Sequence, residues 1–142
     1  MIEKIFAGKK LAAIIVRNNF QNDGISFFTP NDFSQQLACM NHKKGKIIQP
    51  HIHNPVTREV LYTKEVLFIK KGKLRVDFYD EKKDYLQSTI LNAGDVILLA
   101  HGGHGFEVLE DLEMFEVKQG PYAGEEDKSR FQGIDNTEIL IR

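Results

Sequence analysis

Residues 45–72 read GKIIQPHIHNPVTREVLYTKEVLFIKKG, a stretch that combines two histidines with strand-like segments. It places His51 and His53 two residues apart in a strand-like context, and Glu65 opens the β-type run that follows. Successive side chains of a strand point to opposite faces, so the two imidazoles are expected to share one face, with Ile52 turned away. Two imidazoles on one face can bind one metal ion.

A third imidazole, His104, lies beside another apolar strand-like run in residues 94–108, GDVILLAHGGHGFEV. Strand parity places His104 on the same face as Phe106 and Val108, with Glu107 on the opposite face. Together with His51, His53 and Glu65, it predicts a site with three nitrogen ligands and one carboxylate ligand. Such a set suits one divalent transition metal ion, with Fe, Mn, Ni, Co, Cu and Zn all compatible. Four protein ligands leave one or two positions for water, dioxygen or a substrate, which permits catalysis.

The rest of the chain consists of short apolar or alternating segments between Gly, Asn, Asp and Pro residues, without sustained helical periodicity. β-Branched and aromatic residues are frequent in these segments, which favours antiparallel strands. The expected strands cover residues 11–16, 24–29, 34–42, 46–53, 65–71, 73–80, 86–91, 95–100, 105–110, 112–119 and 137–142. The sequence therefore predicts an all-β sandwich or barrel, with the N-terminal segment and the C-terminal tail extending or covering the sheet.

The composition predicts one domain over residues 1–142, because 142 residues with 42% hydrophobic content suit a single core. The formal charge of -1 and the absence of a basic cluster argue against nucleic acid as a partner. The lone cysteine, Cys39, and the lack of a signal-like apolar segment predict a cytoplasmic protein. The apolar run of residues 11–16 is too short to span a membrane, so no membrane partner is expected.

The two histidine segments resemble the paired motifs of the cupin family. That family writes its first motif G(x)5HxH(x)3-4E(x)6G. This chain has Gly45, then five residues to His51, then His53, and later Glu65 with six residues to Gly72. The resemblance covers roughly residues 24–118, with the core motifs in about 45–118. It implies that the four metal ligands are His51, His53, Glu65 and His104.

The first motif departs from the family pattern in one spacing. Eleven residues, NPVTREVLYTK, separate His53 from Glu65, and they resemble an insertion at the mouth of a barrel. Glu59 within this insertion is an alternative carboxylate ligand, but no glycine follows it at the matching distance, so Glu65 is preferred. Arg58 and Tyr62 are the expected substrate-binding residues, because an arginine fork beside a phenol suits a carboxylate, phosphate or sugar group.

The second motif, G(x)5PxG(x)2H(x)3N, is matched more loosely. Gly94 and Gly102 fit, Ala100 replaces the proline, the histidine arrives one residue early at His104, and the final asparagine is missing. His101 is an alternative ligand, although it falls in the glycine-rich turn.

The resemblance implies a double-stranded β-helix, the jelly-roll barrel of cupins, with one divalent metal ion inside it. It also implies a metal-dependent enzyme, either an oxygenase or an isomerase, that acts on a small polar metabolite such as a carbohydrate or sugar-nucleotide derivative. The alternative is a non-catalytic binding module in which the metal is structural or holds a ligand. Similar proteins commonly dimerise through sheet edges, so a homodimer is expected.

Overall fold

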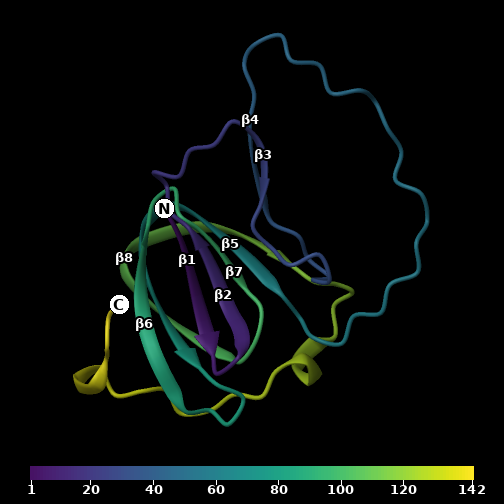
Figure 1. Cartoon of the computed structure of the whole chain (residues 1–142). Coiled ribbons are helices and arrows are strands. Elements are labelled where there is room, and N and C mark those ends of the chain that lie inside the picture. Colours follow the sequence, from purple (N-terminus) through teal and green to yellow (C-terminus); the bar gives the residue numbers. More distant parts are fainter. The chain divides into compact units, whose positions relative to one another are not determined.

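The computed structural model describes all 142 residues and divides into two compact units. The larger unit comprises Met1–Phe20 and Tyr62–Arg142, and the smaller unit is Gln21–Leu61. Eight strands and two short 3-10 turns make up the regular structure (Figure 1), so the predicted all-β class is confirmed. None of the helical segments is long and apolar enough to cross a membrane. The single domain stays a prediction.

The larger unit is one curled antiparallel sheet. Its strands follow the order β1-β2-β7-β5-β6. The last strand, β8, lies outside this order and also pairs with β5. The bounds are β1 Ile2–Ala7, β2 Lys10–Val16, β5 Glu65–Tyr79, β6 Tyr85–Asn92, β7 Val96–Leu99 and β8 Gly103–Lys118. β1 lies in the N-terminal segment, which was expected to extend the sheet. It pairs antiparallel with β2.

β5 and β8 are each one long bent strand, where the sequence predicted two shorter strands in each place. Gly72 has a φ of 88°, and the pairing of β5 with β8 shifts register on both sides of it. The side chains of β5 that belong to the hydrophobic cluster fall on odd positions before the bend, as at Leu67, and on even positions after it, as at Val76. One extra residue in the strand therefore changes its direction, as a β-bulge does.

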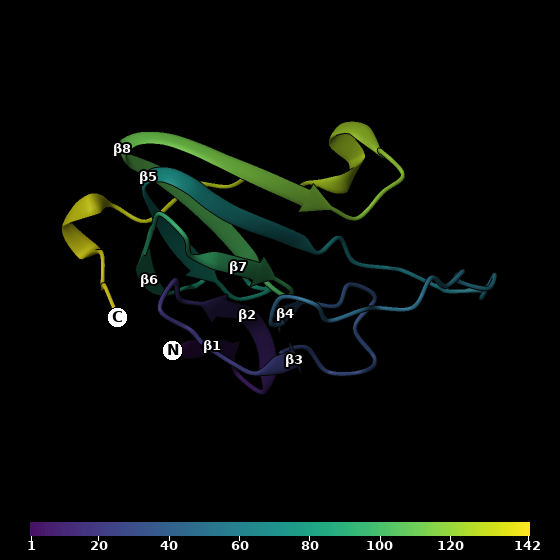
Figure 2. The ribbon, with the colours of Figure 1, turned by 90° about the horizontal axis from the view of Figure 1, so that it is seen from above.

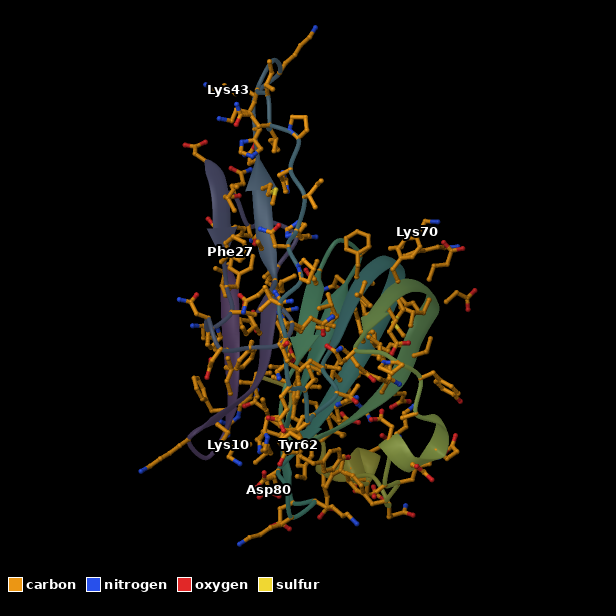
Figure 3. The ribbon with its side chains drawn as sticks, turned by 90° about the vertical axis from the view of Figure 1, so that its right-hand side faces the viewer. Lys10, Phe27, Lys43, Tyr62, Lys70 and Asp80 are labelled. Carbon is orange, nitrogen blue, oxygen red and sulfur yellow. The ribbon has the colours of Figure 1, made fainter.

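The bend folds the β5–β8 ribbon back on itself (Figure 2). A straight strand from Glu65 to Phe78, thirteen residues on, would span about 43 Å at roughly 3.3 Å per residue. His104, which pairs with Phe78 across the ribbon, nevertheless lies beside Glu65. Figure 3 shows Lys70, next to the bend, at the opposite end of the larger unit from Tyr62. The bend thus brings the two ends of the ribbon together.

The hydrophobic cluster of the larger unit lies on one face of the curled sheet, and Ile14 and Leu98 are fully buried on the other face. Alternate residues of β5 contribute to this cluster, because strand side chains alternate between faces. β2 and β7 supply alanine, isoleucine and leucine residues. The buried cluster comprises Ile5, Ala12, Ala13, Ile15, Leu67, Ile69, Leu74, Val76, Phe78, Leu91, Ile97 and Leu99. Glu65 pairs with Leu99, and His104 pairs with Phe78, so both polar side chains share the face that carries the core.

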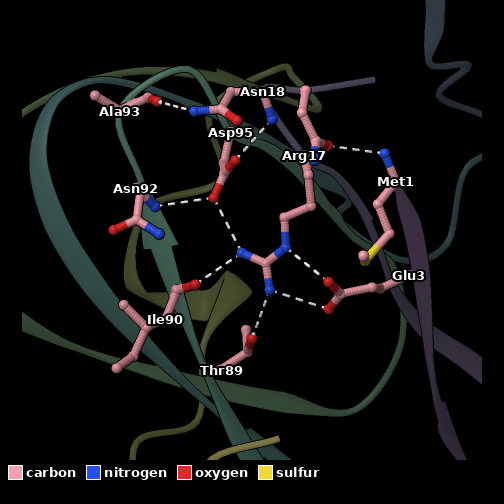
Figure 4. Close-up of polar contacts among 10 residues, drawn as sticks. Met1, Glu3, Arg17, Asn18, Thr89, Ile90, Asn92, Ala93 and Asp95 are labelled. Atoms are coloured by element: carbon pink, nitrogen blue, oxygen red, sulfur yellow. Dashed lines mark hydrogen bonds and ion pairs between the residues drawn. The ribbon is translucent and has the colours of Figure 1, made fainter. Parts of the chain in front are cut away.

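A polar network closes the end of the sheet where β2 ends (Figure 4). Arg17 binds both carboxylate oxygens of Glu3, at 2.7 and 3.0 Å, and donates to Asp95 at 3.0 Å. It also donates to the Ile90 carbonyl and the Thr89 hydroxyl. Asp95 is only 2% exposed and accepts two further hydrogen bonds, from backbone N–H groups. One guanidinium therefore links β1 and β6 to the turn before β7.

The C-terminal tail docks on the edge of β6, although the strand expected over residues 137–142 forms only an isolated bridge. The N–H of Ser88 donates to the Leu140 carbonyl at 2.8 Å, and the N–H of Arg142 donates to the Ser88 carbonyl at 2.9 Å. Ser88 and Ile141 form an isolated parallel bridge. Between β8 and this bridge lie the 3-10 turns Gly124–Asp127 and Asn136–Glu138.

The smaller unit contains the antiparallel hairpin of β3, Gly24–Phe27, and β4, Ala38–Asn41. The side-chain amide of Asn22 donates to the carbonyls of Gly24 and Cys39, which holds the two strands together. The strand predicted over residues 46–53 is wrong, because this segment has no regular structure. Pro50 lacks an N–H donor for a strand ladder, which accounts for the failure of the strand to form there.

Candidate functional site

Glu65 and His104 meet on the core-bearing face of the larger unit. Nε2 of His104 lies 3.3 Å from Oε2 of Glu65. Glu65 is the first residue of β5 and is buried, at 8% exposed, whereas the His104 side chain is 31% exposed. The pair therefore combines a buried carboxylate with an imidazole that solvent can reach.

The surroundings of Glu65 favour its ionised form. The hydrogen bond with His104 lowers the pKa of the Glu65 carboxyl, and this effect outweighs burial, which acts in the opposite direction. The nearby charges of Lys118 and Lys128 also lower it. An ionised carboxylate is the form that can bind a cation.

Lys118 and Asp127 extend the pair into a charged cluster. Lys118 ends β8 directly opposite Glu65, and its Nζ lies 3.6 Å from Oε1 of Glu65. The same Nζ lies 4.0 Å from Oδ2 of Asp127 in the first 3-10 turn. Asp127 in turn accepts a hydrogen bond from the Thr63 hydroxyl at 2.5 Å. Sequence reasoning missed Lys118, Asp127 and Thr63, because only the strand register and the returning C-terminal segment place them beside Glu65.

The other two expected ligands, His51 and His53, lie in the smaller unit. Their ring centroids are 5.2 Å apart and their planes are at 77°. Both residues are exposed, and Nδ1 of His51 is 3.0 Å from the Gln49 carbonyl. The two histidines are thus close together despite the absence of a strand. The structure brings the four expected ligands together as two pairs, and it contains no group of three or more His, Cys, Asp or Glu side chains arranged to hold a metal ion.

The alternative ligands have other positions. Glu59 is exposed in the irregular part of the smaller unit. Nε2 of His101 lies 3.0 Å from Oε1 of Glu81, in the turn between β5 and β6, and Lys10 binds the same oxygen at 2.9 Å. His101 therefore already has a carboxylate partner in this structure.

The expected substrate-binding residues are both exposed. Arg58 lies in the smaller unit. Tyr62, in the larger unit, packs edge-on against the His101 ring at a centroid distance of 6.5 Å. Figure 3 shows Tyr62 at the same end of the larger unit as Lys10 and Asp80. Tyr62 is thus near the His101 pair, although most of its ring remains accessible.

The Glu65–His104 pair fits the chemistry of a metal centre. Oxygen and nitrogen ligands at about 2.1 Å from one ion are separated by roughly 3.0–3.4 Å when they are adjacent in octahedral or tetrahedral geometry. The observed separation of 3.3 Å lies in that range. Two donors alone form half of the expected ligand set.

Comparisons with known proteins do not identify the chain: no family model matches its sequence, and neither the curated proteins nor the solved structures searched give a match.

Proposed function

We propose that the chain is a metal-binding protein of the cupin type, and that Glu65 and His104, with His51 and His53, bind one divalent transition metal ion. The observation that carries this proposal is the 3.3 Å contact between Glu65 and His104. These residues are 39 positions apart in the sequence, and motif spacing together with strand parity selected them independently of this contact. The curled sheet that holds them is compatible with the double-stranded β-helix, which belongs to the same proposal.

The proposed activity is that of a small metal-dependent enzyme, an oxygenase or an isomerase. Its substrate would be a small polar metabolite such as a carbohydrate or sugar-nucleotide derivative. A bound ion would polarise a carbonyl oxygen or acidify a water molecule. Glu65 and His104 would hold that ion, while the apolar residues on the same face limit access of water from the core side.

Elemental analysis of protein purified without a metal-affinity column tests the metal site. Near-stoichiometric metal is expected in the wild type. Glu65→Gln, His104→Gln and the double variant His51→Ala/His53→Ala are each expected to lose at least tenfold in metal affinity, because each removes a direct ligand.

His42→Gln is the matched control, because His42 is an exposed histidine outside the proposed ligand set. It is expected to retain full metal content, and far-ultraviolet circular dichroism should show that every variant keeps its β-sheet signal. Equal metal content in wild type, control and all ligand variants would disprove the site. Retention in the His51→Ala/His53→Ala variant alone would restrict the site to the larger unit.

Binding of exogenous ligands to the metal distinguishes the proposed enzyme from the alternative, a binding module with a structural ion. A catalytic ion has an open coordination position, whereas a structural ion is closed by its protein ligands. Cobalt-substituted protein titrated with azide is therefore expected to change its visible absorption spectrum. An unchanged spectrum at saturating metal would favour the structural role.

Arg58→Ala tests the proposed substrate contact. An arginine that holds an anionic group contributes charge-assisted hydrogen bonds, so its loss is expected to weaken phosphate binding by about tenfold. Isothermal titration of the metal-loaded protein with inorganic phosphate measures this change, and metal content should stay constant. If the affinity for phosphate is unaltered, Arg58 is not a binding residue.

A further inference from the structure

We infer that the Glu65–His104 site takes a small anionic ligand, and that Lys118 binds its carboxylate or phosphate group. This inference rests on the proposed metal site and assigns it a class of ligand. It comes from the contacts of Lys118, a residue that the motif spacing did not select.

The ammonium group of Lys118 is held in place but is not saturated. A lysine carries three N–H donors. The distances of 3.6 Å to Glu65 and 4.0 Å to Asp127 both exceed the range of about 2.7–3.2 Å for an N–H···O hydrogen bond. The side chain is 30% exposed, so a ligand in solvent can reach it. Lys118 can therefore donate hydrogen bonds to an anion without losing one to the protein.

In each carboxylate that contacts Lys118, the oxygen that does not face Lys118 has a partner of its own. Oε2 of Glu65 contacts His104, and Oδ1 of Asp127 accepts the hydroxyl of Thr63. A cation bound at Glu65 would compensate the negative charge of this carboxylate and so weaken its hold on Lys118. Lys128 adds a second positive charge close enough to act on Glu65. Metal loading would thus turn a balanced cluster into one with excess positive charge, which favours an anionic ligand.

Titration of the metal-loaded protein with inorganic phosphate and with malonate, at constant ionic strength, tests this role. Lys118→Met is expected to weaken binding of at least one probe by about tenfold, because a charge-assisted hydrogen bond is lost, while Lys118→Arg retains most of the affinity. The probe that binds more tightly identifies the preferred group. Metal content should not change in either variant.

Lys70→Met is the matched control. Lys70 is 58% exposed and forms a 3.6 Å ion pair with Glu113 next to the bend, away from the site. The Lys70→Met substitution removes the same charge as Lys118→Met, so it reports the effect of net charge alone. Equal losses of anion affinity in Lys118→Met and Lys70→Met would overturn the inference.

Glu65→Gln provides a test that does not need the metal. This variant removes the carboxylate charge next to Lys118 while retaining its shape, so metal-free Glu65→Gln is expected to bind phosphate or malonate several-fold more tightly than metal-free wild type. The double variant Glu65→Gln/Lys118→Met should lose that gain. A gain that persists in the double variant, or no gain in Glu65→Gln, would refute the role of Lys118. Absence of metal from the wild type would instead refute the proposed function, and this second test would still decide on Lys118.

Discussion

Replacing Arg17 with methionine is expected to lower the free energy of unfolding by about 3 kcal/mol, because it leaves the buried Asp95 carboxylate without its counter-charge. Asp95 is 2% exposed and keeps only its two backbone donors once the guanidinium is gone. Glu3 also loses its bidentate partner, and the carbonyl of Ile90 loses a donor. Urea unfolding followed by circular dichroism measures the change.

Arg130→Met is the control for Arg17→Met. Arg130 also pairs with a carboxylate, that of Glu125, but both side chains are largely exposed. Exposed ion pairs contribute little to stability, so no measurable shift in the urea midpoint is expected. If Arg17→Met and Arg130→Met unfold at the same urea concentration with unchanged slope, the network around Asp95 does not stabilise the sheet.

Gly72→Ala is expected to destabilise the larger unit by about 3 kcal/mol or more, through backbone strain and steric overlap together. The φ of 88° at Gly72 lies in a region that residues with a Cβ rarely adopt. A Cβ built there would lie 2.1 Å from the carbonyl oxygen of Asp111, which belongs to the backbone of β8 and cannot rotate away.

Gly8→Ala is the matched control for the bend. Gly8 also has a positive φ, 63°, but a Cβ there would meet nothing within 4 Å. It should therefore cost only the conformational part, about 1 kcal/mol. Thermal unfolding measures the melting temperatures of Gly72→Ala and Gly8→Ala. Equal melting temperatures would show that the close approach of β5 and β8 at Gly72 contributes nothing.

The local pattern of the sequence was sufficient to predict the all-β class of fold. Alternating and β-branched segments identified β2, β3, β4, β6 and β7, because side-chain period and strand propensity are local properties. Parity from His104 correctly placed Glu107 on the opposite face, where it pairs with Arg75. Motif spacing selected Glu65 and His104, which the structure places in contact.

The errors arose where non-local contacts decide the structure. The sequence predicts separate strands over residues 65–71 and 73–80, but Gly72 between them forms a bend within one continuous strand. The pairing with β8, which is a non-local contact, determines this outcome. Residues 46–53 have the composition of a strand, yet Pro50 removes a donor and no strand forms. Lys118 could not be identified from sequence, because its position depends on a strand register that joins residues 53 positions apart.

The docking of the C-terminal tail on β6 bears on how copies of the chain can meet. An edge strand presents unpaired N–H and C=O groups that can recruit a strand from another molecule. In the middle of β6, the N–H and the carbonyl of Ser88 are already occupied by Leu140 and Arg142. A strand from a neighbouring molecule therefore cannot form a continuous ladder of hydrogen bonds along β6. Aggregation through this edge would first require the tail to dissociate from β6.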